Sequence, residues 1–513
     1  MARPARAWRH VPAGRVVHQV DGPIRGDQGF DCGQIRTERR RPTPAAAIAN
    51  RNRMSRSPRA VVAVALLLGI RPSPRVGGWP GIGYHSSKVD FGRAGCKPGR
   101  WISPFQWVVW SSQTARPAGL ESRALVAKGR GDRYRAGMPE TTTLTRSPLH
   151  AFHVEHQAKI VDYAGWELPL HYGSIGDEHL WTRSSGSIFD VSHMGRLRIS
   201  GRHARKFLDR VCTRLVRGMK EGQCRYGLIC NEAGGCLDDV LVYCFSDDDY
   251  MVVCNGANRA KITAHFNRVK AEEDLVFKMV DETESTCMCA IQGPKVMELL
   301  GKVSREVPTL KRYRFTVKNV LVMKIIVSRT GYTGEDGVEV ILGSKFARQA
   351  LGMLLKDIGA EGGVVRPAGL GARDSLRMEA GMPLYGHELD EQTDPISAGL
   401  QFAVKLDKGE SDAQEGRFIG QDALQRIAAD GPERRLVGLK LDGRRSPRQG
   451  MSVLDGDRAV GIVTSGCPSP TLGHPIGMAY VPAEMAEAGG KVRIDLGGGT
   501  DAEIVPLPFY KRP

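Results

Sequence analysis

Three short segments place charged side chains where a purely structural role does not require them. In the first, residues 231–240, the adjacent carboxylates Asp238 and Asp239 open a strongly apolar strand. Because successive side chains of a strand point to opposite faces, one carboxylate can face water while the other faces the interior. The pattern fits equally well a turn that follows Gly234-Gly235 and contains both acids.

The other two segments carry a carboxylate and a pair of guanidinium groups. Residues 329–340 place Glu339 in a run of Val and Ile, where burial of an unpaired carboxylate would be costly. A solvent-facing position on an alternating strand is therefore the simpler interpretation. Residues 367–379 predict a helix with Arg373 and Arg377 four positions apart, a spacing that is also typical of a salt-bridged helix face. From the pattern alone, a chemical and a structural role stay open at both segments.

Signatures of several other chemistries are absent from the sequence. It contains no GxxxxGK[ST] phosphate loop, no HExxH zinc motif and no GxSxG nucleophile motif, and Gly369-Leu370-Gly371 follows no predicted strand. The nine cysteines of residues 138–513 show neither a CxxC pair nor zinc-ligand spacing. We therefore expect reduced, buried thiols in a cytosol-like compartment and no metal site.

Charge divides the chain into two unlike parts. The formal net charge of the 513 residues is +17, yet residues 1–137 hold 25 of the 73 Lys and Arg and 7 of the 56 Asp and Glu. The remaining 48 basic and 49 acidic side chains balance, which excludes a charge-driven polyanion binder for residues 138–513. We interpret residues 1–137 as a basic, disordered or non-native extension before a natural start at Met138. A basic arm for nucleic acid or a membrane surface is the alternative.

The elements that must position the charged side chains are a mixture of helices and strands. Apolar residues at helical spacing predict helices over 204–216, 294–301 and 344–358, and alternating or β-branched runs predict strands over 239–245, 250–254, 322–327 and 338–342. From residue 434 onward, short apolar runs alternate with turns, which predicts a small barrel or sandwich. The combination is typical of an α+β fold with a domain boundary near residues 429–432.

The same segments belong to a longer series of motifs. Six blocks occur in the order found in the aminomethyltransferase (T-protein) family of the glycine cleavage system, and this resemblance covers essentially all of residues 140–513. The blocks are Tyr163-Ala164-Gly165-Trp166-Glu167-Leu168-Pro169, Phe189-Asp190-Val191-Ser192-His193-Met194-Gly195, the run from Gly234-Gly235 to Asp238-Asp239, Gly331-Tyr332-Thr333-Gly334-Glu335-Asp336-Gly337, Gly371-Ala372-Arg373-Asp374-Ser375-Leu376-Arg377 and Phe418-Ile419-Gly420.

The resemblance implies an α+β, cloverleaf-like scaffold of three domains around a channel that holds tetrahydrofolate. Residues 138–429 would form a folate-binding region of two subdomains, and residues 430–513 a C-terminal β-barrel. The implied reaction transfers the one-carbon unit of a lipoyl-bound aminomethyl group to tetrahydrofolate, with release of ammonia and formation of 5,10-methylenetetrahydrofolate. Tetrahydrofolate would be a co-substrate and the lipoyl group would come from a carrier partner, the H-protein, without metal, nucleic acid or membrane. The expected location is the cytoplasm, or the mitochondrial matrix in a eukaryote.

The resemblance also implies roles for individual residues. Asp239 would be the catalytic carboxylate near the N5/N10 edge of folate, and Asn255 would contact the folate beside it. Tyr332 and Glu339 would hold the pterin, and Arg373 would bind folate from its helix. The other residues expected to line the pocket are Met194, Tyr226 and Val253.

Two relatives on the same scaffold compete with this interpretation. A folate-binding paralogue that assists iron–sulfur protein maturation carries a Lys-Gly-Cys-Tyr-x-Gly-Gln-Glu element, whereas residues 415–422 contain no cysteine, which favours the transferase. A folate-dependent demethylase of a small methylated amine or sulfonium compound shares the folate residues, so the sequence distinguishes it less well from the transferase. One departure from the family pattern is Phe402, where many relatives carry Trp, and it could alter the packing at the channel.

Overall fold

The computed structural model describes residues 143–302, 304–320, 323–354, 363–410 and 416–512. The predicted extension over 1–137 and the predicted start at Met138 lie outside these residues. The helices are α2 (His150–Glu155), α3 (Ile175–Ser184), α4 (Ala204–Val211), α5 (Arg259–Glu272), α6 (Val296–Gly301), α7 (Ser344–Leu354), α8 (Leu370–Glu379) and α9 (Gln421–Asp430), with 3-10 turns η1 (Gly256–Asn258), η2 (Val307–Thr309), η3 (Gln401–Ala403) and η4 (Ala483–Met485).

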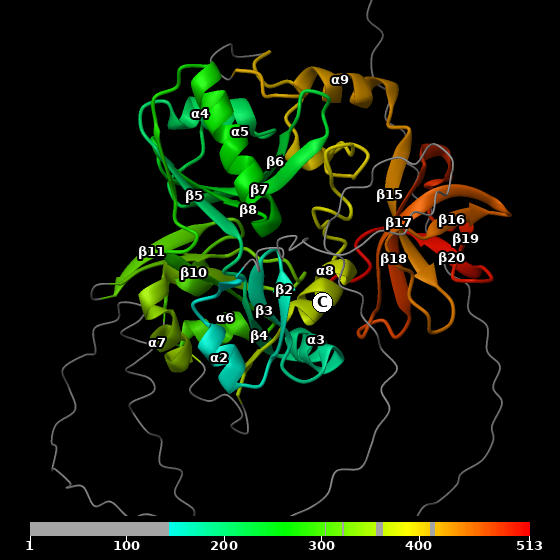
Figure 1. Ribbon diagram of the computed structural model, residues 1–513, viewed down its shortest axis with the longest axis horizontal. Helices are drawn as coiled ribbons and strands as arrows, with labels where there is room; N and C mark the ends of the chain where they lie inside the picture. The colour runs from blue at the N-terminus through cyan, green and yellow to red at the C-terminus, as the bar shows by residue number, and fades with distance from the viewer. Residues whose placement is uncertain (1–142, 303, 321–322, 355–362, 411–415, 513) are drawn as a thin grey trace, which may run out of the picture. The chain divides into compact units, whose positions relative to one another are not determined.

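The strands form sheets and a closed barrel (Figure 1). In a three-stranded sheet the order is β1 (Thr145–Arg146), β3 (Trp166–His171), β2 (Lys159–Tyr163). In a six-stranded sheet it is β11 (Phe315–Val320), β12 (Met323–Ser328), β13 (Gly337–Gly343), β10 (Thr286–Gln292), β4 (Gly186–Asp190), β14 (Val365–Pro367). In a five-stranded sheet it is β6 (Gln223–Cys230), β7 (Cys236–Ser246), β8 (Asp249–Cys254), β5 (Gly195–Ser200), β9 (Lys278–Asp281).

The two larger sheets bury apolar side chains on both faces. On β7, Val240 and Val242 belong to a core shared with α4 and α5, whereas Tyr243 points to the opposite face and packs with residues of the six-stranded sheet and α8. On β13, Val338 packs in the core that includes α6 and α7 residues, whereas Ile341 belongs to the core between the sheets. Strand alternation therefore gives each sheet a helix-covered face and an inner face.

The C-terminal strands close into a barrel, so the barrel prediction is confirmed and the sandwich alternative is wrong. Their order is β15 (Arg434–Leu441), β18 (Pro475–Pro482), β17 (Arg458–Pro468), β16 (Ser452–Asp455), β19 (Lys491–Ile494), β20 (Thr500–Val505). The helices, the sheets and the barrel together confirm the α+β class. The domain limits at residues 137 and 429 stay predictions.

The predicted elements are confirmed with some changes of length. The strands predicted over 239–245 and 250–254 form as β7 and β8, which pair antiparallel as a hairpin. The helix predicted over 204–216 ends at Val211, because Cys212 is extended and pairs with Ile229 in an isolated bridge. The helix that begins at Ser344 is described as far as Leu354, and its predicted end near residue 358 lies outside the described residues.

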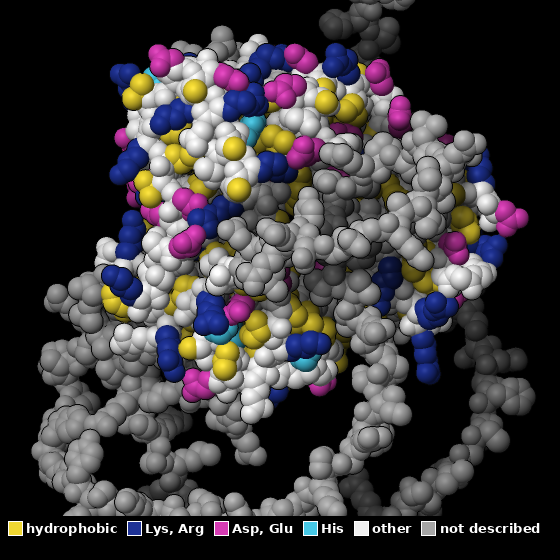
Figure 2. Space-filling view, viewed as in Figure 1, with side chains coloured by type: hydrophobic (Ala, Val, Ile, Leu, Met, Phe, Trp, Pro, Cys, Tyr) yellow, Lys and Arg dark blue, Asp and Glu magenta, His cyan; other side chains and the backbone are white. Residues whose placement is uncertain are grey.

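The thiols and the surface charge agree with the sequence-based expectations. The nine cysteines from Cys212 to Cys467 are buried and unbridged. Figure 2 shows Lys and Arg side chains interspersed with Asp and Glu over the described part of the visible face, as the balanced charge of residues 138–513 predicts. Among the described residues, no helix has both the length and the apolar character needed to cross a membrane.

Candidate active site

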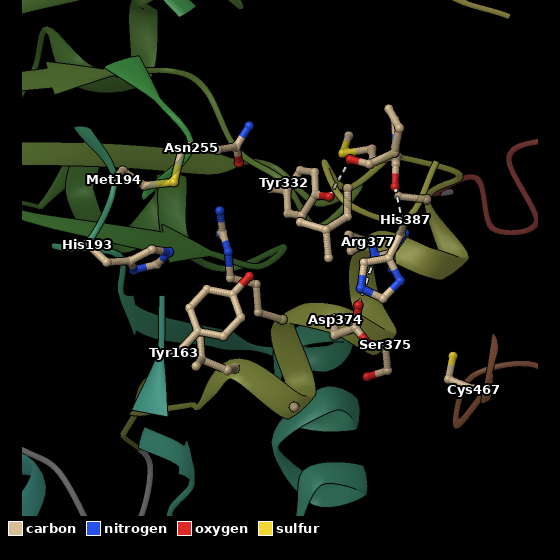
Figure 3. A pocket seen from close by; sticks show the side chains of 18 of the residues that line it. Tyr163, His193, Met194, Asn255, Tyr332, Asp374, Ser375, Arg377, His387 and Cys467 are labelled. Atoms are coloured by element: carbon tan, nitrogen blue, oxygen red, sulfur yellow. Dashed lines mark hydrogen bonds and ion pairs between the residues drawn. The ribbon is translucent and has the colours of Figure 1, made fainter. Parts of the chain in front are cut away.

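A cavity of about 1080 Å³ lies against the inner faces of the two large sheets, α8 and a loop of the barrel (Figure 3). Its wall contains every residue that the resemblance assigned to the site, namely Met194, Tyr226, Asp239, Val253, Asn255, Tyr332, Glu339 and Arg373. The fold therefore gathers side chains that are up to 179 positions apart in the sequence. The chemical roles of these residues stay predictions.

The adjacent carboxylates of β7 point to opposite faces of their sheet. Asp238 is fully buried on the face that α5 covers, and Asp239 is partly exposed in the cavity wall. The turn alternative is wrong, since β7 already begins at Cys236. Asp239 Oδ1 accepts from Asn255 Nδ2 at 2.7 Å and Oδ2 accepts from the hydroxyl of Tyr226 at 3.2 Å.

Burial governs the acidity of this pair. It raises the pKa of the Asp239 carboxyl, although the hydrogen bonds from Asn255 and Tyr226 oppose the shift. Burial also raises the pKa of Asp238, and the neighbouring charge of Asp239 adds to that effect. Two carboxylates this close together repel each other when both are ionised, so their negative charge raises the free energy of the site. A cationic group in the cavity would lower that free energy.

Glu339 is buried, so the solvent-facing interpretation of its strand is wrong. It is 5% exposed and shares the inner face of β13 with Ile341, which packs against residues of the five-stranded sheet. Its Oε2 accepts from Thr330 Oγ1 at 2.5 Å. A buried carboxylate with one oxygen held in this way has its second oxygen available for a ligand.

The two arginines of α8 have different surroundings despite their regular spacing. Arg377 is 1% exposed and donates to Asp374 of the same helix at 2.8 Å, so the salt-bridge interpretation is confirmed for it. It also donates to Glu388 and to Ser465 of the barrel, each at 2.8 Å. Arg373 faces the cavity, and its Nη1 is buried without a hydrogen-bond partner. The guanidinium carbon of Arg373 lies 4.8 Å from the ring centroid of Tyr332.

His193 is a cavity residue that the sequence interpretation left out. It is 5% exposed, its Nδ1 has no hydrogen-bond partner, and its ring meets the edge of Tyr163 at 5.1 Å between centroids (Figure 3). Burial and the charge of Arg373 lower the pKa of His193 to about 3, which keeps the imidazole neutral. The only sequence signal was its place in the block 189–195, next to the assigned Met194.

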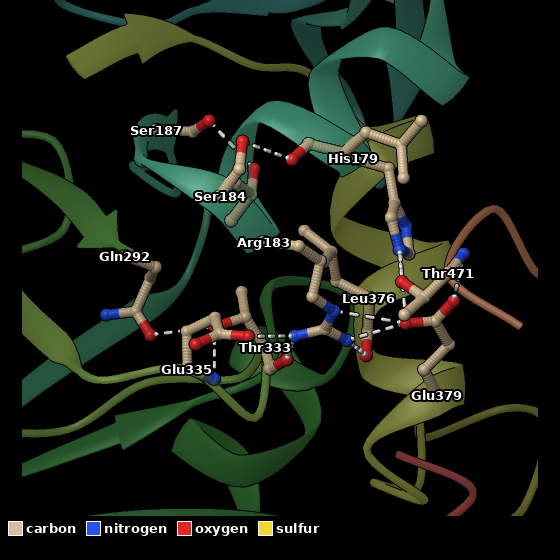
Figure 4. A network of polar contacts seen from close by, with 12 residues as sticks. His179, Arg183, Ser184, Ser187, Gln292, Thr333, Glu335, Leu376, Glu379 and Thr471 are labelled. Atoms are coloured by element: carbon tan, nitrogen blue, oxygen red, sulfur yellow. Dashed lines mark hydrogen bonds and ion pairs between the residues drawn. The ribbon is translucent and has the colours of Figure 1, made fainter. Parts of the chain in front are cut away.

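A second polar cluster holds α8 against α3, the Gly-rich loop of residues 331–337 and the barrel (Figure 4). Arg183 donates to Glu379 Oε2 at 2.9 and 3.1 Å and to Glu335 at 2.9 Å. The other oxygen of Glu379 accepts from the backbone N–H of Thr471 at 3.1 Å. Although burial opposes the shift, hydrogen bonds from His179 and Ser469 and the charge of Arg183 lower the pKa of Glu379 to about 2.

The polar side chains of the cavity wall and of the cluster around Arg183 and Glu379 are suited to organic ligands and to ion pairs, respectively. Within the ranges that the structure describes, no group of three or more His, Cys, Asp or Glu side chains is arranged to hold a metal ion. Among the open acceptors and donors of the cavity are the carboxylates Asp239 and Glu339, the guanidinium of Arg373 and Nδ1 of His193. Such a set matches a flat heterocycle that presents several N–H groups and a carbonyl or carboxylate.

Comparison with known proteins gives one consistent result. Residues 149–408 match the family model of the GCVT N-terminal domain, and residues 434–511 match that of the glycine cleavage T-protein C-terminal barrel domain. The aminomethyltransferase of Rubrobacter xylanophilus is 47% identical over 371 residues, which are 72% of this chain and 95% of that protein. The aminomethyltransferase of Saccharopolyspora erythraea is 42% identical over 370 residues, 72% of this chain and 98% of that protein.

A solved structure supports the same assignment. The glycine cleavage system aminomethyltransferase T from Bartonella henselae superimposes with a TM-score of 0.65 and 31% sequence identity, over 72% of this chain and 99% of that one. Two family models in sequence order, and relatives that align over nearly their whole length, cover the sheets, α8 and the barrel that surround the cavity. The chain therefore belongs to the glycine cleavage T-protein family of aminomethyltransferases.

Proposed function

We propose that this chain transfers the one-carbon unit of a lipoyl-bound aminomethyl group to tetrahydrofolate, and that the cavity is where the transfer takes place. The observation that carries the proposal is Asp239, a carboxylate held by Tyr226 and Asn255 in the wall of a cavity that is large enough for a folate. The other substrate would arrive on the lipoyl arm of a carrier protein, the H-protein of the system. We expect the enzyme to work in the cytoplasm, or in the mitochondrial matrix of a eukaryote.

Folate binding is assigned to the other polar residues of the wall. A pterin presents an N–H and an amino group side by side, and the carboxylate of Glu339 can accept from both. Arg373 offers the unpartnered Nη1 to a carbonyl or carboxylate of the ligand, and its position over Tyr332 keeps the guanidinium in one orientation. Met194 and Val253 supply apolar contact with the ring system.

The chemistry then follows from position and charge. The thioether R–S–CH₂–NH₂ and tetrahydrofolate give R–SH, NH₃ and 5,10-methylenetetrahydrofolate, so the two folate N–H protons end on sulfur and on ammonia. Holding both substrates in one cavity makes the transfer effectively intramolecular. Positive charge develops on the one-carbon unit as ammonia leaves, and the fixed carboxylate of Asp239 stabilises that charge.

A comparison of methyl and aminomethyl donors tests this function against its rivals. The full chain would be incubated with tetrahydrofolate and, in separate reactions, with an aminomethyl-loaded lipoyl carrier or with small methylated amines. We expect ammonia and methylenetetrahydrofolate from the loaded carrier alone. Product from a methylated amine alone would identify a demethylase and contradict the proposal, and folate binding without product from any donor would point to the paralogue that assists iron–sulfur maturation.

A further inference from the structure

Three N–H groups converge on Asp238, the buried neighbour of the proposed catalytic carboxylate. Its Oδ2 accepts from the backbone N–H of Asn255 at 3.0 Å, and its Oδ1 accepts from Asn255 Nδ2 at 2.8 Å and from Asn258 Nδ2 at 2.7 Å. These three hydrogen bonds oppose the effect of burial on the pKa of Asp238 and favour its ionised form, in which both oxygens accept. Asp238 therefore acts as an acceptor that grips the backbone and the side chain of Asn255 together.

The side-chain amide of Asn255 bridges the two carboxylates. Its Nδ2 donates to Asp238 Oδ1 at 2.8 Å and to Asp239 Oδ1 at 2.7 Å, and these two bonds use both of its protons. Rotating the amide by 180° would set its oxygen against two carboxylate oxygens, so one orientation is strongly preferred. The amide oxygen is then left on the side of the cavity, where Figure 3 shows it turned toward the other labelled residues.

The result is a directed pair of acceptors in the cavity wall. Asn255 has no amide proton left for a ligand, so it can only accept, from an N–H group, and it does so beside the carboxylate of Asp239. A folate amine or the nitrogen of an aminomethyl group has this chemistry. Asp238 itself does not line the cavity, and it reaches the ligand only through Asn255.

We propose that Asp238 is a positioning residue for the transfer, which fixes Asn255 so that its carbonyl oxygen and the Asp239 carboxylate together face the N–H group of the reacting substrate. This inference rests on the proposed function. In Asp238→Asn an NH₂ group replaces one acceptor oxygen, so a donor meets either the backbone N–H or the Nδ2 of Asn255. Rotation of the Asn255 amide relieves only the conflict with its Nδ2, and it turns a donor into the cavity and releases Asp239.

The test is a double-mutant cycle on the full chain, with kcat and the KM for tetrahydrofolate measured for the wild type, Asp238→Asn, Asn255→Ala and the double variant. We expect Asp238→Asn to lower kcat roughly tenfold or more while KM changes by less than about threefold. The reason is that the substitution disturbs the orientation of Asn255, whereas Asp238 itself does not contact the ligand. In the Asn255→Ala background, the further loss should be below about twofold.

A matched control separates positioning from stability. Asp209 is also a buried carboxylate that accepts from backbone N–H groups, those of Val216 and Arg217, but it lies outside the cavity wall. Asp209→Asn should lower Tm and leave kcat within about twofold. If Asp238→Asn does not accumulate in folded form, Asp238→Ser, which is smaller and keeps an acceptor, is measured in its place with the same expected split.

The outcomes separate this inference from the proposed function. An active wild type in which the Asp238 variant keeps kcat within about threefold would overturn the inference alone. The same loss in both backgrounds would also overturn it, because Asp238 would then act independently of Asn255. A folded wild type without turnover would overturn the proposed function and the inference together.

Discussion

Helix α8 lies between two buried polar clusters that differ in how completely their hydrogen bonds are satisfied. On one side, Arg183 and Glu379 have partners at every charged atom, drawn from α3, the barrel and a Gly-rich loop (Figure 4). On the other, Arg373 and His193 have buried nitrogens with no partner and face a cavity. Satisfied clusters stabilise and specify a fold, whereas unsatisfied polar groups in a cavity wall are costly unless a ligand binds them. We call Arg183, Glu379 and their partners the closed cluster, and we call Arg373, His193 and Asp239 in the cavity wall the open cluster. The difference assigns stability to the closed cluster and binding to the open cluster.

The largest effect is expected at the carboxylate of the open cluster. Asp239→Asn keeps the size of the side chain and removes the charge that stabilises the developing cation, so turnover should fall roughly 100-fold or more. The dissociation constant for tetrahydrofolate should change far less, because the pterin contacts are elsewhere. Steady-state kinetics with equilibrium folate binding measure both quantities. Turnover within threefold of wild type would show that Asp239 is not the critical group.

The closed cluster should respond in stability and with a defined dependence on pH. The pKa of Glu379 in the folded chain, about 2, lies below its usual 4.5, so the charged form stabilises the fold. That stabilisation is complete above about pH 5 and is lost as the pH falls from 4.5 toward 2. Glu379→Gln should therefore lower the free energy of unfolding at pH 7 by about 2 to 3 kcal/mol.

Denaturant unfolding of the wild type and Glu379→Gln at a series of pH values measures this difference. We expect the gap between the two curves to be constant above about pH 5 and to narrow below it, with folate binding unchanged at pH 7. A gap that is absent at pH 7, or that does not narrow in acid, would contradict the closed-cluster assignment.

The two arginines of α8 sharpen the comparison, because they are the same residue type on one helix. Arg373→Met should weaken tetrahydrofolate binding roughly tenfold, the loss of one charge-assisted contact, and leave Tm close to the wild-type value. Arg377→Met should lower Tm and leave tetrahydrofolate binding close to the wild-type value, since Arg377 is bound to Glu388 and Ser465. Calorimetric binding and thermal melts of both variants give the two readouts. Equal effects of the two substitutions on folate binding would remove the distinction.

The smallest effect is expected at His193, and it should appear only in acid. Its pKa in the folded chain, about 3, is below the usual 6.5, so the unfolded chain binds a proton there that the folded chain does not. The wild type should therefore lose stability as the pH falls below 6.5, and His193→Gln should remove about 1 kcal/mol of that loss between pH 7 and 5.5. Identical pH dependence of the two unfolding free energies would show that His193 titrates normally.

Strand alternation made part of the site predictable from the sequence. The apolar runs over 239–245 and 250–254 indicated the strands β7 and β8, and a period of two placed Asp238 and Asp239 on opposite faces. The motif blocks supplied the remaining assignments, and the fold places all of those residues in one cavity wall. Local pattern therefore sufficed where a side chain's surroundings come from its own hairpin.

Surroundings that depend on distant segments were not predictable in the same way. Glu339 looked solvent-facing because its own strand does not reveal that the five-stranded sheet packs on its inner face. Arg373 and Arg377 have the same helical context, and only the barrel residue Ser465 and the loop residue Glu388 tell them apart. The helix predicted to reach 216 stops at Val211 because Cys212 pairs with Ile229, a partner 17 positions away.

The central claim is that the open cluster carries out aminomethyl transfer to folate. The most direct test supplies the full chain with tetrahydrofolate and a lipoyl carrier loaded with the aminomethyl group, and follows ammonia and methylenetetrahydrofolate in the same reaction. Our account predicts that the two products appear together in equal amounts. Tight binding of tetrahydrofolate without either product would contradict it.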